Sequence, residues 1–496
     1  MRYTSTRDKN VHVTAAEAIT RGISADGGLF VPETIPQITL DDLMRLSALD
    51  YRGRAKEILS LYLTDFTEKE IADCVDGAYA DGKFSSPETA PLVPLADGSE
   101  ILELWRGPTC AFKDMALQLL PYLLTVAAGK AAGGRQIVIL VATSGDTGKA
   151  ALAGFKDVPN TQIMVFYPSD GVSPMQKLQM TTQEGGNVAV CAIQGNFDDA
   201  QSGVKKIFTD PEVAALLAEK NKMFSSANSI NWGRLVPQVV YYVSAYCDLL
   251  KKGAIRCGDA INVVVPTGNF GNILAAYYAK EMGVPIRRLL CASNKNKVLT
   301  DFIETGVYDR RRDFYCTSSP SMDILISSNL ERLLFLLSDM DDRKTASWMK
   351  ALNEEGVYDV GTEMHQKITA LFSGGCCDEE ATKVLIRDVF AEDRYLCDTH
   401  TAVAVQMYRN YRAATGDNTK TVIASTASPY KFSKNVLAAV APDVQAADEF
   451  EMVDALFEKT GFACPEQLKA LKDKPVRFTD CCTRETMRKA VLDAML

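Results

Sequence analysis

The sequence contains six short apolar runs, and each is followed by a polar or glycine-containing turn. A helix-like stretch follows most of these turns, so strand and helix patterns alternate along much of the chain. Such alternation is typical of a parallel sheet that is covered on both faces. We therefore predict an α/β fold. The six runs are QIVILVAT (136–143), TQIMVFYP (161–168), NVAVCAI (187–193), INVVVPT (261–267), RRLLCAS (287–293) and KTVIAST (420–426).

The segments outside these runs indicate how the chain is divided. With 496 residues the chain is too long for one simple core. A Gly- and Pro-rich lead-in and a periodic stretch up to Tyr79 predict a small, mainly helical N-terminal domain. Residues 330–393 read as helical and charged, with GGCCDEE as an irregular interruption. We predict an N-terminal domain at 1–95, α/β regions at 96–255 and 256–440, and a C-terminal helical tail at 441–496 that packs on the α/β core.

Composition and charge exclude several classes of protein. A formal charge of −9 argues against a protein that coats nucleic acid or an anionic membrane. The 13 cysteines include no CxxC pair and only three histidines are present, so no zinc site of recognised spacing is expected. The N-terminus lacks the apolar segment of a secretory signal, and no apolar run approaches the length of about 18 residues that a membrane helix needs. We expect a cytoplasmic protein with reduced thiols and no bound metal.

A lysine in an apolar setting is the first candidate functional residue. Lys113 lies in GPTCAFKDMALQ, where most of its neighbours are apolar. Burial lowers the pKa of a lysine, and a desolvated amine can form a Schiff base with a carbonyl compound. The alternative is a lysine at the start of a helix, whose stem lies on the core while its amine reaches water.

Two turns between a predicted strand and a predicted helix are candidate anion sites. They are SGDTG (144–148) and GNFGN (268–272). Small residues let backbone N–H groups approach an anion closely, and the start of a helix favours negative charge. The first turn lacks two required residues of the nucleotide triphosphatase loop, and the second is not GxGxxG. The alternative for either is a tight connection with a good helix cap, which Asp146 or Thr147 would supply in the first turn.

The lysine and the two turns together match the needs of one class of enzyme. A pyridoxal phosphate enzyme requires a lysine for the aldehyde, a cradle for the phosphate and a partner for the ring nitrogen. A second anion site would suit a substrate that carries its own carboxylate or phosphate. This combination is harder to obtain by chance than any one of its parts.

The chain closely resembles the threonine synthase family, in its longer form, over nearly its whole length. The resemblance is carried by YTSTRD, GLFVP, GPTCAFKDMALQ, ATSGDTGKAAL, GVSPMQKLQM, GNFDDAQSGVKK, SSANSINWGRL, VPTGNFGNILAAYYAK and STASPYKF. It implies a fold-type II pyridoxal phosphate enzyme, with two parallel-sheet α/β domains and a small N-terminal domain. It also implies a lyase of threonine biosynthesis, monomeric or homodimeric, that converts O-phospho-L-homoserine and water to L-threonine and phosphate.

The resemblance also assigns cofactor-binding residues. Lys113 would hold pyridoxal 5'-phosphate, and Thr426 would place a hydroxyl opposite the pyridine nitrogen. A hydroxyl partner leaves that nitrogen largely neutral, so the ring withdraws electrons less strongly than one paired with aspartate. The loop that would bind the cofactor phosphate consists of Gly268, Asn269, Phe270, Gly271 and Asn272.

Substrate contacts are expected from two motifs, SGDTG and SSANSINWGRL. Arg234 is the natural bidentate ligand for an anion, although it could also be a surface arginine on a helix. Lys431 is a further candidate of the same kind. The expected substrate-binding residues are Ser144, Asp146, Thr147, Asn228, Ser229, Asn231 and Arg234, with Ser226 beside them.

Two histidine positions deserve comparison with the family. Many long-form members carry a histidine in the late motif, where this chain has Ser428. His400, in CDTHTAVAV, lies where the family has a histidine followed by small residues on a helix. It either contributes to the site or is a core histidine with satisfied hydrogen bonds.

Three other functions compete with threonine synthase. A phospho-lyase that releases 2-oxobutanoate and ammonia would share the same motifs. A fold-type II dehydratase acting on serine or threonine is disfavoured by the extra N-terminal domain and by SSANSIN. A noncatalytic phosphate- or nucleotide-binding module would leave Lys113 without a role.

Overall fold

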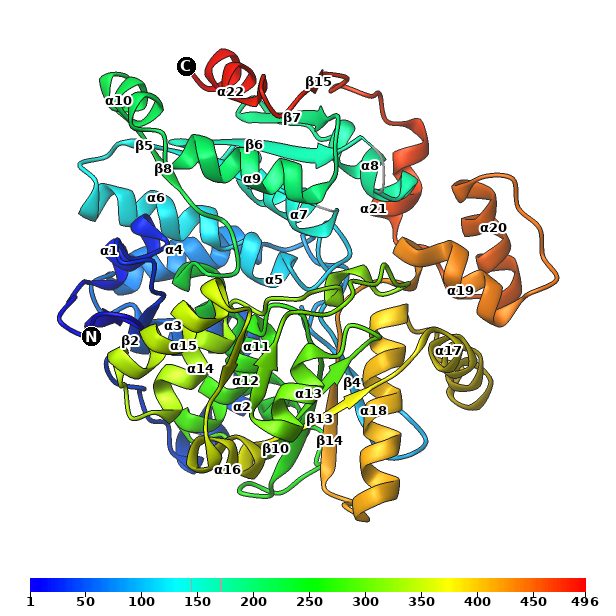
Figure 1. Ribbon diagram of the computed structural model, residues 1–496. Helices are drawn as coiled ribbons and strands as arrows, with labels where there is room; N and C mark the ends of the chain where they lie inside the picture. Colours follow the sequence, from blue (N-terminus) through cyan, green and yellow to red (C-terminus); the bar gives the residue numbers. More distant parts are fainter. Residues whose placement is uncertain (144, 170–171) are drawn as a thin grey trace.

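Two β-sheets form the framework of the computed structural model, which describes residues 1–143, 145–169 and 172–496 (Figure 1). In this described part, the larger sheet has six strands in the order β13-β10-β9-β14-β4-β3, parallel except for the antiparallel pair β3–β4. The smaller sheet has five parallel strands in the order β15-β7-β6-β5-β8. The larger sheet consists of β3 (Leu92–Pro94), β4 (Glu100–Glu103), β9 (Ile261–Pro266), β10 (Ile286–Ser293), β13 (Phe372–Cys376) and β14 (Lys420–Ser425), and the smaller of β5 (Gln136–Ala142), β6 (Thr161–Pro168), β7 (Val188–Ile193), β8 (Lys222–Ser225) and β15 (Cys481–Cys482).

Each sheet is buried on both faces. Val263 of β9 belongs to one hydrophobic core and its neighbour Val264 to another. In β5, Ile139 contributes to the first core and Leu140 to a third. Because alternate side chains meet different cores, these strands are apolar throughout rather than alternately polar. The six apolar runs in the sequence form β5, β6, β7, β9, β10 and β14, which confirms the predicted α/β fold.

Helices of very different length cover the sheets (Figure 1). The long α11 packs against α12, and α18 lies against β9, β10 and β14. On the smaller sheet, α7 and α9 contact β6. The helices of this part are α5 (Asp114–Leu117), α6 (Leu120–Ala131), α7 (Asp146–Phe155), α8 (Pro174–Thr181), α9 (Phe197–Phe208), α10 (Pro211–Glu219), α11 (Trp232–Lys251), α12 (Gly271–Met282), α13 (Val298–Thr305), α14 (Leu330–Leu337), α15 (Asp342–Glu354), α16 (Thr362–Leu371), α17 (Glu379–Asp393) and α18 (Thr399–Thr415), with the 3-10 turn η1 (Pro320–Met322) and the hairpin of β11 (Val307–Asp309) and β12 (Val357–Asp359).

The N-terminal region is mainly helical. It contains the antiparallel pair β1 (Tyr3–Ser5) and β2 (Phe30–Pro32), and the helices α1 (Ala15–Arg21), α2 (Leu40–Ser47), α3 (Tyr51–Tyr62) and α4 (Glu68–Ala78). Reciprocal capping boxes led by Thr14, Thr39 and Thr67 fix where α1, α2 and α4 begin. The domain boundaries given above remain predictions.

Two short edge strands differ from the sequence-based expectations. The stretch Phe372–Cys376, whose last three residues belong to the expected irregular interruption GGCCDEE, is strand β13 and pairs with β10. A Cβ on Gly375 would lie 2.1 Å from the sulfur of Met407, so glycine is what lets this strand approach α18. In the tail, Cys481–Cys482 forms β15 beside β7, where only helices were expected. A strand of two residues is too short to show a period in the sequence.

The predicted tail, 441–496, also contains the helices α20 (Glu449–Thr460), α21 (Glu466–Lys469) and α22 (Met487–Met495) and the 3-10 turn η3 (Ala470–Asp473). The 3-10 turn η2 (Pro429–Phe432) and α19 (Ser433–Val440) lie directly before it. The chain runs from α19, which packs against α17 and α20, to α22 beside β7 of the smaller sheet (Figure 1).

Candidate active site

Lys113 lies directly before α5, in a segment that is held against the end of β14. The N–H of Phe112 donates to the carbonyl of Thr426 (2.8 Å), and Ala111 forms an isolated bridge with Ala427. The Lys113 side chain is only 12% exposed, and Nζ donates to Ser321 Oγ (3.2 Å). The amine is therefore held by protein groups, and the alternative of a lysine reaching into water is wrong.

Asp146, the first residue of α7, is the carboxylate nearest to the Lys113 amine among the described residues. Its Oδ2 lies 3.9 Å from Lys113 Nζ, and its Oδ1 lies 2.5 Å from Lys431 Nζ. Gln176 Nε2 also donates to Oδ1 (3.0 Å). One buried carboxylate thus lies between two buried lysines, and the positive charge of Lys431 holds the pKa of Asp146 well below its usual range.

Burial lowers the pKa of Lys113 to about 8. The negative charge of Asp146 opposes this shift, whereas the positive charges of Arg234 and Lys431 reinforce it. A fraction of the Lys113 amine is therefore uncharged near neutral pH. An uncharged amine is the form that attacks a carbonyl carbon or accepts a proton.

A network around Thr109 anchors the same segment. The Thr109 carbonyl accepts a hydrogen bond from Lys431 Nζ (3.0 Å), while its N–H and hydroxyl donate to Asp114 (2.8 and 2.7 Å). Burial raises the pKa of Asp114 to about 6. A third desolvated lysine, Lys149 on α7, donates to Gln183 Oε1, and burial lowers its pKa to about 7.

The loop Gly268–Asn272 joins β9 to α12 and is held mainly through its backbone. Ser327 Oγ donates to the Gly268 carbonyl (2.7 Å), and the N–H of Asn329 donates to the Asn269 carbonyl (3.1 Å). Phe270 has a left-handed backbone (φ 62°) that turns the chain into α12. The loop therefore has the expected form of a turn between a strand and a helix.

Ser321 connects this loop with the lysine. A Cβ on Gly268 would lie 2.4 Å from the Ser321 carbonyl, so the two backbones are in close contact. The Ser321 hydroxyl is the acceptor for Lys113 Nζ. The predicted cofactor residues Lys113, Gly268 and Thr426 are thereby brought to one place, although they are far apart in the sequence.

Two of the predicted substrate residues lie on or next to α11. Arg234, on α11, is buried at 5% exposure, so the alternative of a surface arginine is wrong. Its guanidinium donates to the Ala227 carbonyl (2.8 Å), no carboxylate among the described residues forms an ion pair with it, and burial lowers its pKa to about 10. Asn231 caps α11 and also donates to the carbonyls of Ile19 and Ser226.

The other predicted substrate residues vary in exposure. Asn228 is exposed, and Ser229 and Thr147 are half-buried. Ser144 lies outside the described residues. Substrate binding by these residues stays a prediction.

Several residues of the site were not among those predicted from the sequence. Nothing in the sequence marks three of them as functional: Ser321, Gln176 and Asp398. Of these, Gln176 lies in the motif GVSPMQKLQM. Ser428 caps η2 with its side chain, which is a structural use of the position where other family members have a histidine. Only the contacts of these side chains in three dimensions connect them with Lys113.

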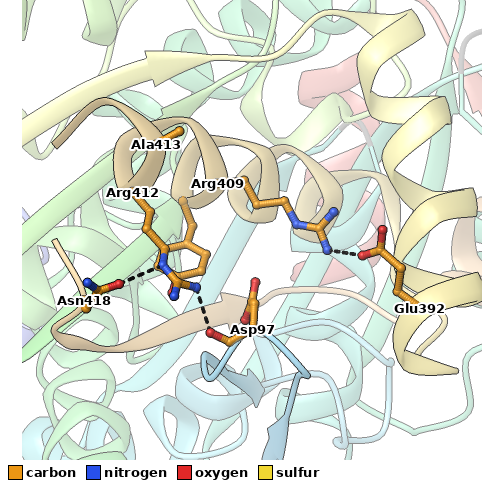
Figure 2. Close-up of a pocket in the computed structure, with 7 residues that line it drawn as sticks. Asp97, Glu392, Arg409, Arg412, Ala413 and Asn418 are labelled. Atoms are coloured by element: carbon orange, nitrogen blue, oxygen red, sulfur yellow. Dashed lines mark hydrogen bonds and ion pairs between the residues drawn. The ribbon is translucent and has the colours of Figure 1, made fainter. Parts of the chain in front are cut away.

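A hollow of about 460 Å³ lies elsewhere, at the C-terminal end of α18 (Figure 2). Arg409 forms an ion pair with Glu392 (2.8 Å), and Arg412 donates to the backbone carbonyl of Asp97 (2.8 Å). It contains none of the predicted site residues. The residues that line it are Asp97, Glu392, Tyr408, Arg409, Arg412, Ala413 and Asn418.

The described residues contain neither a metal-binding cluster nor a membrane-spanning helix. No group of three or more His, Cys, Asp or Glu side chains in the described ranges is arranged to hold a metal ion. Among the helices that the structure describes, none is long and apolar enough to cross a membrane. All 13 cysteines are free.

Comparison with known proteins places this geometry in a family. Residues 2–79 match the family model "Threonine synthase N terminus", and residues 401–491 match "Threonine synthase, C-terminal". Threonine synthase of Saccharomyces cerevisiae is 34% identical over 99% of this chain and 97% of its own length. The chain belongs to the threonine synthase family.

Solved structures of the family agree with the fold. The structure of pyridoxal phosphate-bound threonine synthase from Brucella melitensis superposes with a TM-score of 0.89 and is 34% identical, over 100% of this chain and 99% of that one. The yeast threonine synthase structure gives a TM-score of 0.89 at 33% identity, over 100% and 98% of the two chains. The fold is therefore that of threonine synthase, a fold-type II α/β fold with two parallel sheets.

A second group of family relatives has a different name and a greater length. "Threonine synthase-like 1" of Macaca fascicularis is 39% identical over 86% of this chain. The match spans only 58% of that protein. Membership of the family therefore leaves the reaction of this chain to be inferred from its site.

Proposed function

We propose that this protein is a pyridoxal phosphate-dependent threonine synthase, which converts O-phospho-L-homoserine and water to L-threonine and phosphate. The observation that carries the proposal is the Lys113 amine. It is buried, has its pKa lowered to about 8, and lies between a carboxylate and a hydroxyl beside a glycine-rich loop. A noncatalytic binding module has no use for such a lysine.

The residues present fit pyridoxal phosphate. The amine of Lys113 is the group that binds its aldehyde, and the backbone N–H groups at the start of α12 suit its phosphate. In the same loop Asn272 Nδ2 is a buried donor without a partner among the described residues. Thr426 is buried beside the lysine segment, and we assign its hydroxyl to the pyridine nitrogen. When bound, the cofactor supplies an electron-withdrawing ring that acidifies the carbon atoms next to the substrate amine.

The protein supplies proton transfer and charge. Lys113 Nζ, uncharged in part near its pKa, takes a proton from the substrate Cα and later returns one. Asp146, 3.9 Å away, balances the positive charge that Nζ then carries. Ser321 Oγ accepts a hydrogen bond from Nζ and limits the directions in which the amine points.

Arg234 supplies the recognition of an anionic substrate. A buried guanidinium without a carboxylate partner is ready to bind a phosphate or carboxylate, and Arg234 contributes to the lowered pKa of Lys113, so its charge acts at the same site. We assign the phosphate and carboxylate of O-phospho-L-homoserine to Arg234 and to the turns that hold Asp146 and Asn228. The released phosphate leaves from Cγ and water adds at Cβ.

Product analysis tests the proposal. Purified protein is incubated with pyridoxal phosphate and O-phospho-L-homoserine, and phosphate, threonine and 2-oxobutanoate are measured together. We expect equal amounts of phosphate and threonine. Phosphate with 2-oxobutanoate and no threonine would identify a phospho-lyase, and the absence of phosphate release would reject both activities.

A further inference from the structure

His400 is held in one chemical form by its two neighbours. It lies in the first turn of α18 and is 1% exposed. Its Nε2 accepts a hydrogen bond from the backbone N–H of Ser321 (3.1 Å), and its Nδ1 lies 2.9 Å from Asp398 Oδ1. A backbone N–H can only donate, so Nε2 must be unprotonated and Nδ1 must carry the hydrogen that Asp398 accepts.

Asp398 is fixed more firmly than the histidine. It is fully buried and caps α18 by accepting from the N–H groups of His400 and Thr401. The Thr401 hydroxyl also donates to it. The imidazole therefore has little freedom to turn, because the helix start itself holds the carboxylate that orients it.

The contact at Ser321 leads directly to the reactive lysine. The residue that gives its N–H to His400 receives a hydrogen bond from Lys113 Nζ on its side-chain oxygen. Its carbonyl lies against Gly268, as described above. Ser321 is thus fixed at its N–H by the histidine, in contact with the cofactor loop at its carbonyl, and bonded to the lysine at its hydroxyl.

We propose that His400 is a positioning residue that acts through Ser321: its imidazole, oriented by Asp398, fixes the Ser321 backbone so that the Ser321 hydroxyl directs the Lys113 amine toward the loop Gly268–Asn272. The inference rests on the proposed function and assigns His400 a use besides core packing. Loss of the Ser321 hydrogen bond would leave the lysine in place but free to turn. The hydrogen bond also favours the charged amine, so its loss lowers the pKa of Lys113 further.

Two substitutions of His400 separate positioning from simple packing. H400N places an amide near the position of Nδ1, where it reaches Asp398 but not Ser321. H400Q places an amide near the position of Nε2, where its oxygen accepts from Ser321 but the contact with Asp398 is lost. If His400 only fills the core, the two variants should be similarly impaired. If it acts through Ser321, only H400N should be impaired in catalysis.

The experiment has one arm that needs neither cofactor nor substrate. In cofactor-free protein, the pH at which Lys113 is half-labelled by an amine-reactive reagent is read by peptide mass spectrometry. We expect S321A and H400N to move this midpoint to lower pH and H400Q to stay near the wild type.

The turnover number should fall roughly tenfold in S321A and in H400N, as for the loss of one hydrogen bond to a charged group. Thermal unfolding is recorded for every variant, and S321A serves as the milder one if His400 variants fold poorly.

The double variant S321A/H400N completes the test. If His400 acts only through Ser321, the double variant should lose no more than about twofold beyond either single one. Losses that multiply, or a labelling midpoint unchanged in both S321A and H400N, would overturn the proposal. A wild-type protein that releases no phosphate would reject the proposed function, and the labelling arm would still decide the role of His400.

Discussion

The turn before α7 and the loop before α12 share one sequence pattern but are held in opposite ways. Each follows a buried strand, contains glycines and opens a helix. In the first, the Asp146 side chain forms close contacts with two lysines and a glutamine. In the second, backbone carbonyls accept hydrogen bonds from neutral residues, and Gly268 touches the backbone of Ser321. The pattern locates both turns at the site, but their partners differ. At the first, Asp146, Lys113 and Lys431 form a buried ion-pair cluster. The second, the loop Gly268–Asn272, is a backbone cradle held by main-chain contacts.

Removing the lysine that both turns face should have the largest effect. K113A lacks the amine that binds the cofactor and moves the proton, so we expect activity to fall by at least about 10³-fold. The absorbance of the lysine-bound cofactor should disappear while the thermal unfolding midpoint changes little. K113R is the matched control, since it keeps the positive charge but cannot form a Schiff base. Full activity in K113A would show that Lys113 neither binds the cofactor nor moves the proton, and the two turns would then not share an active lysine.

Removing one partner from the ion-pair cluster should destabilise the protein. K431M leaves the buried Asp146 carboxylate without its closest counter-charge, and breaking a buried ion pair in this way costs about 3–5 kcal/mol. We expect a corresponding loss in the free energy of unfolding measured by denaturant titration. The double variant D146N/K431M removes both charges and should recover much of the loss. Additive losses in the double variant would show that the two groups are not coupled.

The backbone cradle should be sensitive to shape rather than charge. In G268A the added Cβ would lie 2.4 Å from the Ser321 carbonyl, so the loop must move. In G271A the corresponding contact is 3.4 Å, with the Asn329 side chain. We expect G268A to weaken pyridoxal phosphate binding roughly tenfold or more, and to lower stability by about 1–3 kcal/mol, as for overpacking.

The matched variant G271A should be much closer to the wild type in both measurements. Cofactor affinity is read by fluorescence or absorbance titration, and stability by thermal unfolding. Equal effects of the two substitutions would contradict a cradle defined by the Gly268 contact.

The sequence predicts the framework of this molecule well, because its signals are local. The apolar runs that form β5, β6, β7, β9, β10 and β14 follow from burial on both faces of a sheet. Strand β13 was not predicted because its two glycines, Gly374 against Thr300 of α13 and Gly375 against Met407 of α18, remove the apolar signal. Strand β15 is two residues long and depends on pairing with a partner almost 290 residues away.

Residues of the site could be predicted only where their type is unusual for its sequence context. Lys113 stands out as an amine among apolar neighbours, and the glycine-rich turns stand out by composition. Ser321 and Gln176 have common residue types, and their importance comes from atoms that touch Lys113 and Asp146. Arg234 was ambiguous in the sequence, since only the fold shows that it is buried without a carboxylate partner among the described residues.

The first turn should also set the pH at which Lys113 becomes active. The Asp146 charge raises the pKa of Lys113 against the effect of burial. In D146N that support is lost, so the pKa of Lys113 should fall below about 8. A process that needs the uncharged amine increases as pH rises through this pKa. Its midpoint should therefore move to lower pH in D146N, measured by the labelling of Lys113 in protein that has been shown to remain folded.

The smallest expected effect concerns Lys149, which lies in the first turn of α7, three residues after Asp146. Burial lowers its pKa from its ordinary value to about 7, so between about pH 7 and pH 10 the unfolded chain binds more protons there than the folded protein. Its contribution to stability must then increase with pH across that window. In K149M this dependence is absent, and the slope of the unfolding free energy against pH should decrease by at most about 1.4 kcal/mol per pH unit. Denaturant titrations across the window measure the slope, with K156M as the control because Lys156 is exposed at the end of the same helix. An unchanged slope in K149M would mean that Lys149 is not desolvated. The buried charges near the first turn would then be only those of the ion-pair cluster, Lys113, Asp146 and Lys431.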